Sequence, residues 1–301
     1  MDAIFAIDKP VGPTSHDVVA RVRRAAGQRR VGHAGTLDPL ASGVLVVALG
    51  NATRLVEYLT ADDKAYRAVI AFGTETSTDD AEGAPTRTAD AAHVDGAAIA
   101  GAFGAFRGTI EQRPPAFSAI SVGGERLHAL ARRGIAVVAP LRTVTIEAID
   151  LISWDAPRAT IDVTCGKGTY VRSIARDLGA AVGSAAHLAG LRRTRSGTFH
   201  IDNATPLDAL EAALRDGTWQ AMAIDMADAM PRLPLVRLDD RQVKDVSAGR
   251  PIDADADTRA DGSGHATIHA RGIAPDGRLV AILRPVGPHR WHPEKVLAVA
   301  D

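Results

Sequence analysis

The chain has 301 residues, is 46% hydrophobic, and carries 35 basic against 36 acidic residues. This length suits one large domain and a small one, and the hydrophobic content is that of an ordinary globular protein. No apolar run approaches the ~20 residues that span a bilayer, and no signal-peptide pattern opens the chain, so we expect a cytoplasmic protein without membrane contact.

The first seventy residues alternate between β-branched runs and helical patterns. Thr14 or Ser15 is a suitable N-cap for a helix that runs to about Ala26 and ends at Gly27. The run 43–49 is too short and too β-branched to favour a helix, and indicates a buried strand. The other elements expected in this part are a strand over 3–7, a short helix over 52–59 and a strand over 65–72.

The middle of the chain predicts further strands and helices. The polar segment 74–90 is rich in Thr, Asp and Ala, so we expect an exposed loop. In the predicted helix 170–181, Arg172 lies off the apolar stripe and is free to point into a cleft. Long strands with irregularly inserted helices predict an α+β fold around a mixed, mostly antiparallel sheet. The remaining elements are strands over 144–154, 159–165 and 188–199, and helices over 97–106, 127–133 and 206–214.

The last quarter of the chain differs in pattern. The segment 226–234 predicts a linker. Beyond it, short strand-like pieces at 266–270 and 279–283 are separated by Asp/Gly turns, which is typical of a small β-rich module. We therefore expect two domains, 1–230 and 231–301.

Basic residues are unevenly distributed despite the near-zero net charge. The stretch 18–37 contains five arginines and no acid, and Arg192, Arg193 and Arg195 form a second cluster, whereas acids concentrate elsewhere, as in 79–82. Such segregation suits one basic face that binds nucleic acid through its phosphates. For Arg21 to Arg24 alone, a solvated helix face explains the charges equally well.

The most informative stretch is 30–43, Arg-Val-Gly-His-Ala-Gly-Thr-Leu-Asp-Pro-Leu-Ala-Ser-Gly. It presents a carboxylate, Asp38, and an imidazole, His33, from a glycine-punctuated loop just before a buried strand. Pro39 biases Asp38 toward an extended conformation. The alternative is structural, because Asp before Pro is common in turns and histidines are common in cores and on surfaces.

Rival motifs are weaker. The piece 166–169 lacks the upstream glycine and the Lys-Ser/Thr pair of a phosphate-binding loop. A metal cluster of His265, His269, His289 and His292 has no supporting cysteine or acid spacing, so no metal site is expected. Cys165, the single cysteine, excludes an internal disulfide and is expected to be a semi-buried strand residue.

Read whole, the stretch 30–43 resembles the catalytic loop of the TruB family of tRNA pseudouridine synthases. The resemblance extends from residue 3 to about 200. It also covers the opening motif Asp-Lys-Pro-Val-Gly-Pro-Thr-Ser (8–15), Lys-Ala-Tyr-Arg (64–67), Arg-Pro-Pro-Ala-Phe-Ser-Ala (113–119), Cys-Gly-Lys-Gly-Thr-Tyr-Val-Arg-Ser (165–173) and His-Leu-Ala-Gly-Leu-Arg-Arg (187–193). More weakly, 247–252 resembles the small RNA-binding module of PUA type that often ends this family.

The resemblance implies a function. These enzymes isomerise a uridine in the T loop of tRNA, at the position conventionally numbered 55. They need no cofactor. The expected partner is tRNA, no protein partner is expected to be required, and the protein is expected to be a monomer. A non-catalytic RNA chaperone and a synthase acting on another RNA remain alternatives.

The resemblance also assigns roles to residues. Asp38 would be the catalytic carboxylate, which either adds to C1′ or removes a 2′-proton, and Arg172 would pair with it. Tyr66 would stack on the uracil, and its phenol could also assist proton removal. Taken alone, Tyr66 and Leu191 are better explained by core packing. The residues expected to contact substrate are Leu191, which would close the pocket, His33, which would fill the vacated place in the RNA stack, Lys9 and Pro10 in a supporting loop, and Arg29, Arg30, Arg192 and Arg193 at phosphates.

Overall fold

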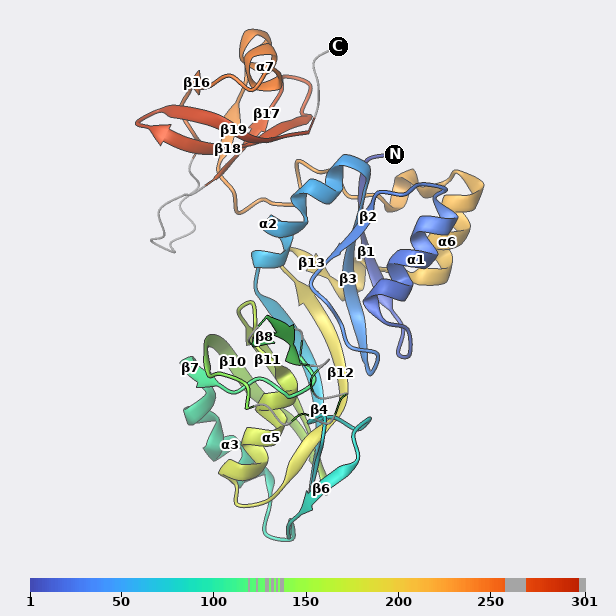
Figure 1. The fold of residues 1–301 in the computed structure, drawn as a ribbon, viewed down its shortest axis with the longest axis vertical. Helices are drawn as coiled ribbons and strands as arrows, with labels where there is room; N and C mark the ends of the chain where they lie inside the picture. Colours follow the sequence, from blue (N-terminus) through green and yellow to red (C-terminus); the bar gives the residue numbers. More distant parts are fainter. Residues whose placement is uncertain are drawn as a thin grey trace.

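The computed structural model describes residues 1–118, 120–122, 124–127, 130, 133, 135, 138–257 and 269–297. Its main element is a ten-stranded sheet (Figure 1). The strand order is β14 (Thr205–Pro206), β1 (Ala3–Lys9), β3 (Ala41–Leu49), β12 (Ala186–Ser196), β4 (Lys64–Phe72), β11 (Arg158–Cys165), β10 (Arg142–Asp155), β7 (Gly108–Gln112). Off this path, β2 (Val31–Ala34) pairs with β3, and β13 (Phe199–His200) with β12.

Most of these pairings are antiparallel. The pairs β1 with β14 and β3 with β12 are parallel. The predicted α+β fold with a mixed, mostly antiparallel sheet is therefore confirmed. No helix in the described part of the chain is long and apolar enough to cross a membrane.

One part of the sheet is covered by α1 (Ser15–Ala25) and α6 (Leu207–Asp216). The predicted start of α1 is confirmed. The Thr14 side chain accepts from the Asp17 amide, and the Asp17 carboxylate accepts in return from the Thr14 amide. Buried side chains such as Phe5 and Leu45 form the core beneath these helices.

A second apolar core lies farther along the sheet, where α5 (Val171–Ala181) and α3 (Gly96–Ala102) pack near β4, β11 and β10. Ile70, Ile161 and Ile174 belong to this core. Tyr66 and Leu191 contact both cores, so they lie at the boundary between them. Short 3-10 helices join the larger elements: η1 (Gly50–Leu55), η2 (Phe103–Phe106), η3 (Ile201–Asn203) and η4 (Trp219–Met222).

The prediction of an exposed loop over 74–90 is wrong in part. The segment contains a small hairpin of β5 (Thr74–Thr76) and β6 (Pro85–Thr88). Thr76, the last residue of β5, and Asp80, in the loop between the two strands, are buried. Backbone bonds fasten the intervening loop to Leu188 at one end of β12. The composition of the segment reflects only its average polarity and does not indicate these long-range backbone hydrogen bonds.

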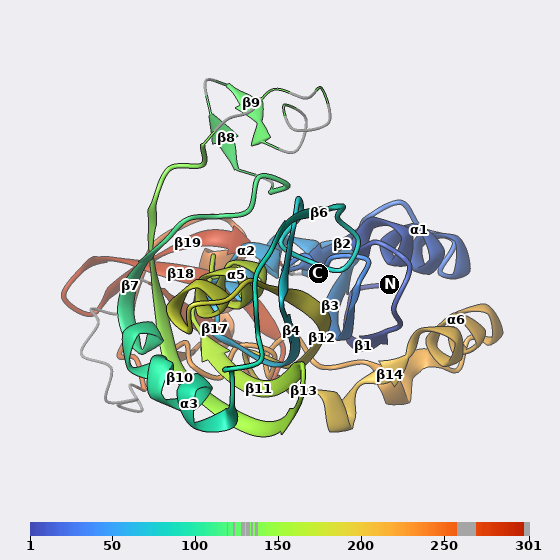
Figure 2. The same cartoon turned by 90° about the horizontal axis from the view of Figure 1, so that it is seen from below.

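A second irregular segment follows β7 and carries β8 (Ser121–Val122) and β9 (Glu125–Arg126). Figure 2 shows this hairpin extending away from the main sheet. The helix predicted over 127–133 lies largely outside the described residues.

The C-terminal part forms a separate five-stranded sheet, drawn in orange and red in Figure 1. The expectation of a small, PUA-like β-rich module is confirmed, although the strand predicted over 266–270 lies mostly outside the described residues. Its elements are β15 (Leu235–Arg237), β17 (Ala270–Ile273), β18 (Leu279–Gly287), β19 (Arg290–Val296), β16 (Ile252–Asp253) and the helix α7 (Asp240–Ser247).

The segment predicted as a linker is packed rather than free. Ala229 and Met230 are buried in one apolar cluster with Ile282 of β18. The β-rich module also contacts α2 (Val56–Ala61), where the Lys295 ammonium lies 2.9 Å from the Glu57 carboxylate. The β-rich module is therefore joined to the rest of the protein by both apolar and charged contacts.

Candidate active site

The loop that carries Asp38 is fixed on both sides of this residue. The Ser15 hydroxyl accepts from the Leu37 amide at 2.8 Å and donates to the Leu37 carbonyl at 3.0 Å. The Gly12 amide donates to the Pro39 carbonyl at 2.9 Å. The turn 8–15 and the loop thus form one unit, which presents the carboxylate from a rigid backbone. The glycine-rich stretch is shorter than predicted, because its first residues form β2.

Lys9 stabilises this loop through hydrogen bonds to its backbone. Its ammonium is fully buried and donates to the Ala41 carbonyl at 2.6 Å and the Pro10 carbonyl at 2.9 Å. Burial lowers the pKa of Lys9, and the nearby Asp38 carboxylate partly opposes that shift. These bonds show that Lys9 holds the backbone near Asp38, in the loop that was expected to support the site. Pro10, beside it, is exposed.

Asp38 and Arg172 form the predicted pair. Arg172 Nη2 lies 3.1 Å from Asp38 Oδ2. The Arg172 side chain is 8% exposed, whereas that of Asp38 is 43% exposed. A covered cation thus faces a carboxylate that solvent or a ligand can still reach. The pairing joins the N-terminal loop to α5, which the chain reaches more than a hundred residues later.

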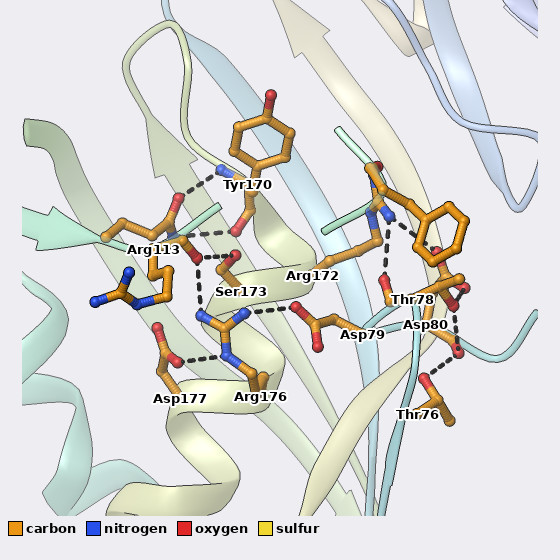
Figure 3. A network of polar contacts seen from close by, with 12 residues as sticks. Thr76, Thr78, Asp79, Asp80, Arg113, Tyr170, Arg172, Ser173, Arg176 and Asp177 are labelled. Carbon is orange, nitrogen blue, oxygen red and sulfur yellow. Dashed lines mark hydrogen bonds and ion pairs between the residues drawn. The ribbon is translucent and has the colours of Figure 1, made fainter. Parts of the chain in front are cut away.

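Arg172 is itself oriented by several acceptors. It donates to the carbonyls of Thr78 and Phe117, each at 3.1 Å, and lies 3.4 Å from the Asp80 carboxylate (Figure 3). With Asp38, these groups surround the planar guanidinium, so its direction is determined from several sides.

Asp80 is a site residue that sequence reasoning missed. Its side chain is 5% exposed, and it accepts from the Thr78 hydroxyl and from the Glu82 amide. No local signal distinguishes Asp80 from the other acids of this polar segment, because its partner is 92 positions away in the chain.

Tyr66 and Leu191 line the boundary between the two cores. Both are half-buried, and Leu191 is paired with Ala41, three residues after Asp38. Burial raises the pKa of Tyr66, and the guanidinium of Arg193 partly opposes this shift. The phenol is therefore protonated at neutral pH, which favours stacking or hydrogen-bond donation over proton abstraction.

Arg193 and Arg192 were both predicted to contact phosphate, and the structure separates them. Arg193 is 1% exposed, and its guanidinium donates to the Val44 carbonyl at 2.6 Å and the Gly35 carbonyl at 3.0 Å. Because its donors are used by the loop, the structure favours a role for Arg193 in fixing the loop over the predicted phosphate contact. Arg192 is exposed and pairs with Asp8 at 2.9 Å. Alternation along β12 places it on the sheet face opposite to Arg193.

The remaining predicted residues lie on β2 or just before it. Arg29 and Arg30 are exposed at the end of β2 away from Asp38. His33 is half-buried, and its ring packs edge-to-face against His16 with centroids 5.4 Å apart. Burial, helped by His16 and Arg193, lowers the pKa of His33, so the ring is neutral at pH 7.

The structure also bears on rival chemistry. Among the residues that the structure describes, no three His, Cys, Asp or Glu side chains are grouped to hold a metal ion. His269 and His289 contact separate carboxylates, those of Glu294 and Asp255, and His265 lies outside the described residues. Burial raises the pKa of Cys165 to about 11, which disfavours a thiolate nucleophile at neutral pH.

Comparison with solved structures defines the class of protein. A structure described as a Cbf5-Nop10-Gar1 complex matches with a TM-score of 0.77 and 28% identity, over 99% of this chain and 85% of that one. An H/ACA RNP bound to a substrate RNA containing 2′-deoxyuridine matches with a TM-score of 0.74 and 26% identity, over 98% and 85%. The fold is that of the pseudouridine synthases.

Sequence comparison is more specific. Residues 23–171 match the profile of the TruB family pseudouridylate synthase N-terminal domain, and residues 172–227 match that of the tRNA pseudouridylate synthase B C-terminal domain. A protein from Gloeobacter violaceus is 51% identical over 223 residues, which are 72% of this chain and 76% of the relative. One from Thermobifida fusca is 44% identical over 289 residues, covering 93% and 94%. Both relatives are named tRNA pseudouridine synthase B. The chain belongs to the TruB family of pseudouridylate synthases.

Proposed function

We propose that this protein isomerises uridine to pseudouridine in the T loop of tRNA, at the position conventionally numbered 55. The observation that carries the proposal is the pair of a 43% exposed Asp38 and an 8% exposed Arg172, 3.1 Å apart. A guanidinium held by surrounding acceptors fixes the direction of the carboxylate, and the exposed side of the carboxylate faces outward to a substrate.

The reaction needs such a carboxylate beside a ribose. The N1–C1′ bond breaks, the uracil turns, and a C5–C1′ bond forms; C5 loses a proton and N1 gains one, so the product is an isomer. Asp38 acts either by adding to C1′ and leaving again or by removing the 2′-proton to give a glycal. Tyr66 would stack on the detached uracil and Leu191 would close the pocket, which retains the base between the two steps.

The target uridine must leave a folded RNA loop, at a cost of a few kcal/mol. We assign the vacated place in the RNA stack to the neutral ring of His33. The exposed Arg29 and Arg30 would contact phosphates. We divide the chain into a catalytic domain, 1–230, and an RNA-binding module, 231–301.

We further propose that the protein acts as a monomer on free tRNA in the cytoplasm, without a protein partner. Curated relatives named tRNA pseudouridine synthase B are 41–51% identical to this chain, whereas the matched structures that contain Cbf5 with protein partners are 26–28% identical. The higher identity favours the tRNA enzyme over a synthase that works inside an assembly.

The test is tritium release from a T-stem-loop transcript labelled at C5 of uridine. The wild-type protein alone should release tritium, and a transcript with cytidine at the target position should release none. Asp38→Asn should abolish release while RNA affinity stays within about twofold, because a neutral amide neither adds to C1′ nor removes a proton. Arg172→Lys should fail as well, since one ammonium cannot replace the planar fork.

Three outcomes would contradict the proposal. Turnover by Asp38→Asn would remove this residue from the chemistry. RNA binding by the wild-type protein without tritium release would favour the chaperone alternative. Release that depends on an added protein or guide RNA would favour a different RNA target.

A further inference from the structure

A second arginine lies one turn beyond Arg172 on α5 and is not part of the pair with Asp38. Arg176 Nη1 lies 2.6 Å from Asp79 Oδ2, and Arg176 Nη2 donates to the Arg113 carbonyl at 2.8 Å. Its Nε lies 2.8 Å from Asp177 on the same helix (Figure 3). Burial opposes the charged guanidinium, but the two carboxylates outweigh this effect and raise the pKa of Arg176.

The two arginines bridge the same pair of segments. Arg172 reaches Thr78 and Asp80 in the loop between β5 and β6, and Phe117 in the segment after β7. Arg176 reaches Asp79 in that loop and Arg113 in that segment. Because residues four apart on a helix lie on one face, the two side chains form parallel cross-links between the loop and the segment.

Asp79 connects Arg176 to the two loop residues that contact Arg172. Its φ is +60°, a left-handed backbone that a residue with a Cβ rarely adopts. It stands between Thr78, whose carbonyl accepts from Arg172, and Asp80, whose carboxylate faces Arg172. A change of the Asp79 backbone would therefore turn both acceptors away from the guanidinium.

We propose that Arg176 is a positioning residue for the catalytic pair: its ion pair with Asp79 and its bond to the Arg113 carbonyl hold the two segments that orient Arg172 against Asp38. Arg176 does not touch the reacting atoms. The inference rests on the proposed function, because its readout is the isomerisation rate.

The first experiment measures the single-turnover rate of tritium release and the Kd for the same T-stem-loop. Arg176→Met should lower the rate about 10- to 100-fold, as expected for a small misplacement of a catalytic group. The Kd should stay within about twofold. The matched control is Arg21→Met, because Arg21 also pairs with two carboxylates, those of Asp208 and Glu211, but joins α1 to α6. The control should leave the rate unchanged.

The second experiment separates backbone positioning from general destabilisation. In the double variant Arg176→Met, Asp79→Gly, glycine adopts the positive φ freely, and no unpaired buried carboxylate remains. The rate of tritium release should therefore be at least about threefold higher than that of Arg176→Met. Among single variants, Asp79→Asn should be faster than Asp79→Ala, because asparagine tolerates a left-handed backbone better than alanine. This comparison remains informative if Arg176→Met fails to fold.

The outcomes are distinct. A wild-type protein that releases no tritium would refute the proposed function itself. An active wild type with Arg176→Met at the same rate would overturn the role of Arg176. A double variant no faster than Arg176→Met, or Asp79→Ala as fast as Asp79→Asn, would overturn the route through the Asp79 backbone.

Discussion

Replacing Arg193 with methionine separates the two roles considered for this residue. In the structure its buried guanidinium donates to the Val44 carbonyl at 2.6 Å, the Gly35 carbonyl at 3.0 Å and, more weakly, the Thr36 carbonyl at 3.5 Å. Arg193→Met keeps much of the side-chain volume but removes every donor. We expect the main effects to be lower stability and a misplaced Asp38 loop.

The magnitude follows from the carbonyls left without a donor. Each buried group that loses its partner costs about 1–3 kcal/mol, and two of the three bonds are well formed, so the gross loss is about 2–6 kcal/mol. Removing a buried charge returns part of this loss. A net destabilisation of about 3 kcal/mol corresponds to a fall in Tm of about 6–12 °C for a domain of this size.

The measurement combines thermal unfolding with RNA binding at several salt concentrations. A residue that fixes the loop should lower the Tm and the isomerisation rate, and should leave the slope of log Kd against log salt unchanged. A phosphate contact would do the reverse, with an unchanged Tm and a slope reduced by about one. A wild-type Tm with a reduced slope would refute our reasoning about Arg193.

Three further perturbations probe the surroundings of the site. Burial lowers the pKa of Lys64 from its ordinary value of 10.5 to about 8. Between these two pH values the Lys64 side chain keeps its proton in the unfolded chain and loses it in the native one. The free energy of unfolding of the wild type, relative to that of Lys64→Met, should therefore rise with pH across this window. Urea unfolding at pH 7.5 and 9.5 measures this difference, and the same difference at both pH values would contradict the shift. Gly43→Ala should lower the Tm sharply, because φ there is +101° and a Cβ would lie 2.2 Å from a β12 carbonyl oxygen; Gly104→Ala, with nothing within 4 Å, is the control. Arg29→Ala and Arg30→Ala should each reduce the salt slope of tRNA binding by about one, and unchanged slopes would exclude both as phosphate contacts.

Much of the fold could be predicted because its signals are local. The cap at Thr14, the β-branched run before Leu49 and the apolar stripe of α5 each determine an element within a few residues. The pairing of Asp38 with Arg172 came from the family resemblance, since spacing along the chain does not show which residues meet.

Other parts depended on contacts that composition does not report. The segment that contains Asp80 is polar on average, yet its carboxylate is buried against a guanidinium from α5. The roles of Arg192 and Arg193 could have been separated from sequence. Side chains alternate along a strand, so Arg193 shares a face with Leu191, the expected pocket residue, and Arg192 points the other way.

The proposed catalytic pair, Asp38 and Arg172, spans the boundary between the two apolar cores. Asp38 lies in the loop before β3, and Arg172 lies on α5, which packs on the part of the sheet on the other side of β12. The strands β3 and β12 are paired through only three residue pairs. Transient separation of β3 from β12 would pull the carboxylate from its cation and would disturb only the edges of the two apolar cores, where Tyr66 and Leu191 lie. On warming, catalytic competence should therefore fade before the helices melt, and an RNA bound across this boundary would delay that loss.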